Sequence, residues 1–187
     1  LRTEVLNHLA SGKRKGVIVT YPESVMEKVI SKKNLKKNTF QVIKGDKLSL
    51  DFLEEMLHEY NFERVDFVYE PGQYSIRGSI VDVFSYAADY PYRIDFFGDE
   101  IDTIRTFNPD DQLSVTIQKQ VSIIPNIQDI SIEEINDSFT DFLPPSSVIW
   151  TEDGSLIRER INNFWSLTAQ RQESGQISGK TELVMTG

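Results

Sequence analysis

A two-residue turn between two strand-like segments is the feature that most restricts what this chain can fold into. Residues 91–97 and 100–107 are rich in aromatic and β-branched residues, and Gly98-Asp99 separates them. A glycine beside an aspartate favours the tight turns that join antiparallel strands, so we predict a β-hairpin here. The register predicted from this turn pairs two residues of the first strand with two of the second: Phe96 with Ile101, and Ile94 with Thr103.

The alternation along the first strand separates a buried face from a wetter one. The two-residue period of a strand places Ile94 and Phe96 on one face, and Arg93, Asp95 and Phe97 on the other. The uncharged pair is the better candidate for the core, which leaves Phe97 beside Arg93 on the wetter face. An exposed aromatic ring next to an arginine predicts a binding surface. The alternative is that Phe97 packs under a neighbouring loop, and the pattern alone does not decide between the two.

Alternating strand and helix patterns precede this hairpin, and successive strands surround it. Residues 16–20 and 39–43 predict strands, a helix is expected from Pro22 through Ile30, and Ser49 is expected to cap a second helix. From Arg64 onward, turn residues separate five predicted strands of an antiparallel meander, at residues 64–70, 74–86, 91–97, 100–107 and 113–124.

Pro144-Pro145 predicts a break between two units, followed by a buried strand at 147–151 and a helix at 153–172. The predicted fold class is therefore α+β. It has three parts: a partial α/β segment at 1–44, the meander at 45–127, and a linker with a strand–helix piece at 128–187. Because a helical pattern begins at once, without an initiator methionine, we expect the chain to be an excised fragment.

The composition is that of an ordinary globular domain, with 187 residues of which 39% are hydrophobic and 26% charged. Cysteine is absent, which excludes disulfides, thiolate zinc sites and a cysteine nucleophile. No apolar run is long enough to cross a bilayer, and we expect a cytoplasmic protein with no membrane partner.

The net charge of −9 is unevenly distributed along the chain. Residues 1–47 carry 11 basic and 4 acidic residues, a balance of +7, which leaves −16 for the remainder. The stripe of Lys32, Lys33, Lys36 and Lys37 has no interleaved aromatic residues, so a solvated basic face is favoured over a phosphate-binding site. The acidic remainder argues against nucleic acid as the direct partner of the hairpin.

No group of residues predicts catalysis, and neither a metal nor a cofactor is expected. The segment Gly175–Thr181 resembles a phosphate-binding loop, but three residues instead of four separate its glycines. His8 and His58 each lack a second ligand at helical spacing. Asp95 and Asp102 could face one another across the hairpin, although a charge-balanced sheet surface is the favoured interpretation.

Two sequence blocks, Arg77–Phe84 and Arg93–Ile101, resemble the UvrA-interaction domain shared by UvrB and the transcription-repair coupling factor, Mfd. The segment Phe107–Ser114 is more similar to the coupling factor than to UvrB. The resemblance covers residues 1–127 well and the part after Phe142 more loosely. Ser79 and Ser85 depart from the family pattern, where glycine and proline are common.

The resemblance implies a non-catalytic adaptor that recruits UvrA to stalled RNA polymerase, and it places the UvrA contacts on Arg77, Arg93 and Phe97. Arg77 comes from the resemblance alone, whereas the alternation had also selected the other two. In the full-length parent, an ATP-dependent DNA translocase, other domains would bind RNA polymerase and DNA. The resemblance also names the first and third parts of the chain as UvrB-like domains 1A and 1B. Two alternatives remain: a fragment of UvrB itself, or a nucleotide-binding ATPase fragment that uses Gly175–Thr181.

Overall fold

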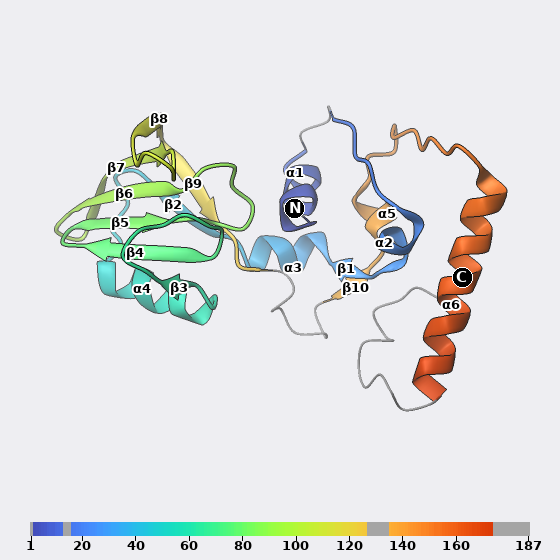
Figure 1. The fold of residues 1–187 in the computed structure, drawn as a ribbon. Helices are drawn as coiled ribbons and strands as arrows, with labels where there is room; N and C mark the ends of the chain where they lie inside the picture. Colours follow the sequence, from blue (N-terminus) through green and yellow to red (C-terminus); the bar gives the residue numbers. More distant parts are fainter. Residues whose placement is uncertain (1, 13–15, 127–134, 174–187) are drawn as a thin grey trace. The chain divides into compact units, whose positions relative to one another are not determined.

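The computed structural model describes residues 2–12, 16–126 and 135–173. The chain divides into two compact units. The first comprises residues 1–7 and 35–129, and the second comprises residues 8–34 and 130–187. The mixture of helices with antiparallel and mixed sheets confirms the α+β class (Figure 1).

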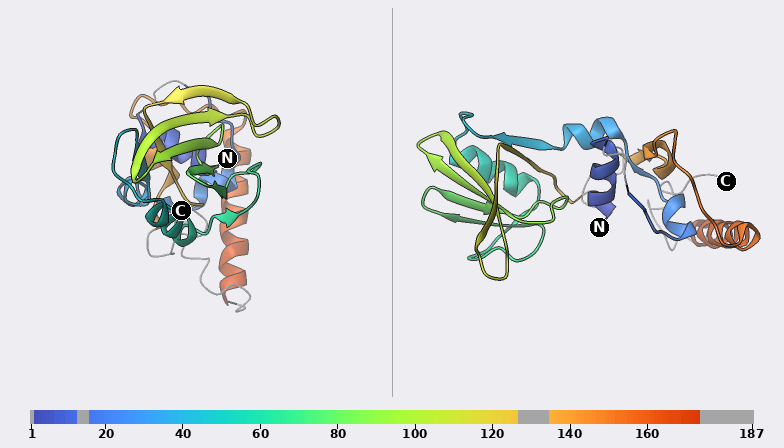
Figure 2. Two further views of the ribbon diagram at one scale, coloured as in Figure 1. Left: turned by 90° about the vertical axis from the view of Figure 1, so that its left-hand side faces the viewer. Right: turned by 90° about the horizontal axis from the view of Figure 1, so that it is seen from above.

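The first unit is built on a six-stranded sheet whose strands follow one another in sequence order. Only β3 and β4 pair in parallel, and every later neighbour pairs antiparallel, as the predicted meander requires. Figure 2 shows this twisted sheet from two further directions. Its strands are β3 (Glu63–Arg64), β4 (Gln73–Arg77), β5 (Ile80–Val83), β6 (Tyr92–Phe97), β7 (Glu100–Phe107) and β8 (Ser114–Gln118).

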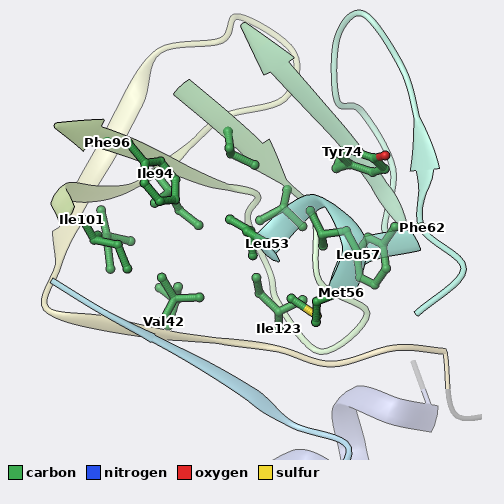
Figure 3. Packing of buried hydrophobic residues seen from close by; sticks show 14 residues of the cluster. Val42, Leu53, Met56, Leu57, Phe62, Tyr74, Ile94, Phe96, Ile101 and Ile123 are labelled. Atoms are coloured by element: carbon green, nitrogen blue, oxygen red, sulfur yellow. The ribbon is translucent and has the colours of Figure 1, made fainter. Parts of the chain in front are cut away.

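The core of this unit is closed by a helix and a second pair of strands. Helix α4 (Leu50–Glu59) begins where predicted, because the Ser49 hydroxyl accepts a hydrogen bond of 3.2 Å from the Phe52 amide. Strand β2 (Phe40–Ile43) pairs antiparallel with β9 (Gln120–Ile123). Side chains from the helix, from this pair and from the large sheet point toward one another (Figure 3). They include Val42, Leu53, Met56, Leu57, Tyr74, Ile94, Phe96, Ile101 and Ile123, and Phe62 from the loop after α4 packs among them.

The predicted β6–β7 hairpin is present, but half of its register differs from the prediction. Phe96 lies opposite Ile101 as expected, whereas Ile94 pairs with Ile104 instead of Thr103. A β-bulge causes the difference, because the register shifts between Asp95 and Phe96 and leaves one extra residue on β7. The bulge lets both Ile94 and Ile104 be fully buried.

Three of the predicted strands are shorter or divided. Residues 74–86 form β4 and β5, because Gly78 adopts a left-handed conformation (φ +63°) and turns the chain. Residues 113–124 form β8 and β9, which belong to different sheets. Of residues 64–70, only Arg64 lies in a strand, at the end of β3. At Gly78 a turn therefore outweighed the strand propensity of the residues around it.

The second unit contains a short antiparallel pair, β1 (Val29–Ile30) with β10 (Ile135–Asp137). Pro22 begins α2 (Pro22–Met26) as predicted, but Val29 and Ile30 lie in β1 and not in a helix. The predicted helix at 153–172 is confirmed as α6 (Gly154–Glu173). Three further helices of the described chain are α1 (Arg2–Ala10), α3 (Lys32–Lys37) and α5 (Phe139–Phe142).

The strands predicted at residues 16–20 and 147–151 do not form. Both segments are irregular, and Val17, Val19 and Trp150 are at least 90% exposed. An extended, β-branched segment becomes a strand only when another strand pairs with it, and among the described residues none pairs with either segment. The phosphate-loop-like segment at 175–181 lies outside the described residues.

Candidate functional site

The face of the six-stranded sheet opposite the core, which we call the outer face, carries charged side chains from adjacent strands. The register places Asp82 of β5 between Ser75 of β4 and Arg93 of β6, and places Arg93 opposite Arg105 of β7. Side chains alternate along each strand, so those two positions away share this face. The outer face includes Ser75, Arg77, Ile80, Asp82, Arg93, Asp95, Phe97, Thr103 and Arg105.

Asp82 lies at the centre of the outer face and is completely buried. Its Oδ1 accepts a hydrogen bond of 2.7 Å from Arg93 Nε, and its Oδ2 accepts one of 2.8 Å from Arg93 Nη2. The same Oδ2 accepts a bond of 2.5 Å from Arg77 Nη2. One carboxylate therefore binds two guanidinium groups, one of them in the bidentate geometry that arginine favours. We call these three residues the Asp82 cluster.

Arg93 is more enclosed than the sequence predicted, with only 16% of its side chain exposed. Its Nη1 and Nη2 also donate to the backbone oxygen and to Oε1 of Gln112, at 3.3 and 3.4 Å. Its guanidinium lies 4.4 Å from the ring centroid of Phe107, a cation–π contact. The hydrogen bonds to Asp82 raise the pKa of Arg93 above its ordinary value. The expectation of a solvent-facing Arg93 is wrong, because the loop carrying Gln112 covers it.

Arg77 is the exposed member of the Asp82 cluster, with 38% of its side chain accessible. Its Nη1 donates a bond of 3.0 Å to the backbone oxygen of Asp66, and its guanidinium lies 5.4 Å from the ring centroid of Phe67. Arg77 and Phe67 line an open hollow of about 590 Å³. The other lining residues are Arg64, Val65, Asp66, Ser75 and Ile76. The Arg77 guanidinium is thus held by the residues beneath it, while part of the side chain remains accessible to solvent.

Phe97 ends β6 and is 84% exposed. No loop in the described part of the chain covers it, which answers the question that the alternation left open. The Phe96 amide donates a bond of 2.8 Å to the Ser79 oxygen, so the end of β6 lies beside the turn that follows Arg77. The structure therefore brings Phe97 and Arg77 to the same end of the outer face.

A second ion pair lies beside the Asp82 cluster. Arg105 Nη2 donates a bond of 2.5 Å to Asp95 Oδ2, and the Thr103 hydroxyl donates to the same oxygen. Asp95 lies opposite Thr103 in the register, so it does not form a carboxylate pair with Asp102, and Arg105 balances its charge, as the favoured interpretation of Asp95 predicts. The Nε of Arg105 is buried without a partner among the described residues, which lowers the net stabilisation from this pair.

The sequence analysis missed the residues that organise the arginines, namely Asp82, Phe67 and Gln112. An acid between two valines in a short strand was a signal for Asp82, because a charge there must be paired when the strand is central. Nothing local pointed to Phe67 or Gln112, which reach the arginines from loops. In the described part of the chain, no three histidine or acidic side chains gather in a way that could hold a metal ion. Nor is any described helix long and apolar enough to span a membrane.

Comparison with known proteins shows what the chain is similar to. Residues 40–128 match the model of the UvrB interaction domain. The transcription-repair-coupling factor of Haemophilus influenzae is 33% identical over 124 residues, which are 66% of this chain and 11% of that protein. The factor of Bacillus subtilis is 34% identical over 125 residues, 66% of this chain and 10% of that protein.

The similarity extends to a second kind of protein. UvrABC system protein B of Streptococcus uberis is 36% identical over 104 residues, 54% of this chain and 16% of that protein. The chain thus spans about a tenth of the length of the coupling factors it matches. Residues 40–128 are thus similar to the UvrB interaction domain, and the chain is similar to a segment of the transcription-repair-coupling factors.

Proposed function

We propose that this chain is a non-catalytic docking module that binds UvrA through the outer face of its six-stranded sheet. The observation that carries the proposal is the exposed Phe97 at the same end of this face as the fixed guanidinium of Arg77. Aromatic residues and arginines are the side chains that most often dominate the binding energy of protein interfaces.

The contacts within the outer face suit recognition of a partner surface that presents a carboxylate next to an apolar pocket. Arg77 is already oriented by Asp82 and Asp66, so binding would cost little of its side-chain entropy. Phe97 offers most of its ring for burial. Arg93 remains part of the proposed site, although its small exposed area limits how much of it a partner can contact.

The wider role is proposed from the relatives. As part of a transcription-repair-coupling factor, the module would recruit UvrA to stalled RNA polymerase in nucleotide excision repair, while other domains of the parent would bind the polymerase and translocate along DNA. We further propose that residues 45–127 are the docking domain, flanked by the UvrB-like segments 1–44 and 128–187. A place in a UvrB-type protein is the second candidate, because such a protein is also among the relatives.

Direct binding to UvrA tests the proposal. We expect the chain to bind purified UvrA in a calorimetric titration, and Phe97→Ala to weaken binding by roughly thirtyfold, about 2 kcal/mol. Phe52→Ala is the matched control, because Phe52 is 50% exposed on α4, which packs on the core side of the sheet. Wild-type affinity in a folded Phe97→Ala variant would refute the site, and absence of binding by the unaltered chain would refute the function.

A further inference from the structure

We infer that Asp82 is the positioning residue of this docking surface: it touches no partner, but it fixes the guanidinium of Arg77 in the orientation that the partner meets. The inference rests on the proposed function, since it assigns a role within the same site. Nothing in the sequence blocks that define the surface gave Asp82 a role, because it lies beneath the residues expected to make contact.

The first argument is geometric. Asp82 lies on β5, between the strand that carries Arg77 and the strand that carries Arg93, and none of its surface is exposed. Its two oxygens accept three charge-assisted hydrogen bonds of 2.5 to 2.8 Å from these arginines. Bonds of this kind are among the strongest and most directional in proteins. A carboxylate held from both sides in a sheet is therefore a rigid support for each guanidinium.

The second argument concerns charge. Two guanidinium groups share one carboxylate, so the Asp82 cluster keeps one unbalanced positive charge. Arg93 is 16% exposed and Arg77 is 38% exposed, so this charge reaches solvent mainly through Arg77. In a chain of net charge −9, Arg77 is thus a cationic point suited to an acidic group on the partner.

The third argument concerns the N–H groups of Arg77 that do not yet donate a hydrogen bond. A guanidinium has five N–H donors. Those of Nη1 point to the Asp66 oxygen at 3.0 Å and to the Ser75 hydroxyl at 3.5 Å, and one of Nη2 binds Asp82. Among the described residues, Nε and the second N–H of Nη2 have no partner. These two donors remain for a carboxylate of the partner.

The decisive variant is Asp82→Asn, which keeps the shape of the side chain but removes its charge and directs an amide N–H₂ at the arginines. We expect its affinity for UvrA to fall by about tenfold or more, which corresponds to about 1.4 kcal/mol. Combined with Arg77→Ala, it should cost much less than the sum of the two single effects, because both remove the same oriented guanidinium. Additive losses would overturn the inference.

Glu54→Gln is the matched control, because it removes a paired carboxylate that lies on α4 and not on the outer face. It should bind UvrA within about twofold of the wild type, which would exclude a general effect of losing a paired acidic group. A loss in Glu54→Gln equal to that in Asp82→Asn would contradict a specific role for Asp82. Thermal unfolding of every variant shows whether the sheet is intact.

The outcomes separate the inference from the proposed function. If Phe97→Ala and Arg77→Ala weaken binding while folded Asp82→Asn binds normally, Asp82 has no positioning role and the docking function stands. If none of these variants affects binding, the docking site itself is wrong. Should Asp82→Asn fail to fold, Asp82→Glu keeps the buried charge and moves the carboxylate by one methylene. A folded Asp82→Glu of wild-type affinity would overturn the inference, and a loss of about fivefold or more would support it.

Discussion

The two faces of the six-stranded sheet are held by different interactions, although the same strands form both faces. Toward the core, Ile94 and Ile104 are completely buried and are held by apolar packing alone. On the outer face, the neighbouring positions Arg93 and Arg105 are held by carboxylates on adjacent strands. Apolar burial stabilises a fold without regard to direction, whereas ion pairs and hydrogen bonds orient individual groups. The comparison indicates that stability depends mainly on the inner face, and the partner recognition that we propose would depend on the outer one.

The largest effect is expected from the inner face. Ile94→Ala removes a side chain that is fully enclosed, and it should lower the free energy of unfolding by about 3 kcal/mol, because the cavity adds to the lost burial. Urea denaturation measures this loss. Ile117→Ala on the edge strand β8, where the side chain is 81% exposed, should change the unfolding free energy by less than about 0.5 kcal/mol. Equal losses in the two variants would remove the distinction between the faces.

Arg93→Ala should show that the outer face also contributes to stability where it is covered. The variant leaves the buried Asp82 with Arg77 as its remaining cationic partner, and we expect a loss of about 2 kcal/mol in unfolding free energy. Arg93→Lys keeps the charge but cannot form the bidentate pair, so an intermediate loss is expected. Denaturation curves of the two variants that match the wild type would mean that Arg93 acts only as a contact residue.

Alkaline pH should weaken the inner face selectively. Burial raises the pKa of Tyr74 and of Tyr92 above the ordinary value near 10, with smaller contributions from Glu54 and Asp89 respectively. The folded chain therefore keeps these protons longer than the unfolded chain does. The stabilisation is complete below pH 10 and is lost as the pH rises through the raised values, by at most about 1.4 kcal/mol per pH unit for each tyrosine. Tyr74→Phe and Tyr92→Phe should flatten the fall in melting temperature, and an unchanged slope in both would contradict the assignment.

The smallest effect on stability is expected from the residue with the largest expected effect on binding. Phe97 is 84% exposed, so Phe97→Ala should change the unfolding free energy by less than about 0.5 kcal/mol. A destabilisation of more than about 1 kcal/mol would show that Phe97 supports the sheet, and its loss of UvrA binding could then be an indirect effect.

Local patterns were sufficient to predict the hairpin and to place Phe97 on the wetter face of the strand, but not to decide whether a loop covers its ring. The period of two and the Gly98-Asp99 turn are properties of a few neighbouring residues, and burial of Ile94 and Phe96 follows from them. The enclosure of Arg93 could not be predicted in this way. It depends on Gln112, which lies 19 residues away and reaches the guanidinium only after the strands have assembled.

The two wrong strand predictions have a different cause. Residues 16–20 and 147–151 have strand propensity, but a strand needs hydrogen bonds from a neighbour that no local pattern reveals. The opposite case is the division of residues 74–86, where Gly78 reversed the chain within a run that reads as continuous. Pairing partners and reversals are tertiary properties, so sequence periodicity identified the faces of strands more reliably than their number.

The bulge in the β6–β7 hairpin changes which face of the sheet each later residue of β7 occupies. Before it, Ile101 faces the core, and strict alternation from there would turn Ile104 outward and Arg105 inward. The exposed Asp102 is the extra residue that resets the alternation. Which side chains this face displays is therefore decided in part by a residue with no partner across the hairpin. A change in chain length at this position would alter which side chains form the proposed docking surface, without changing any residue that belongs to it.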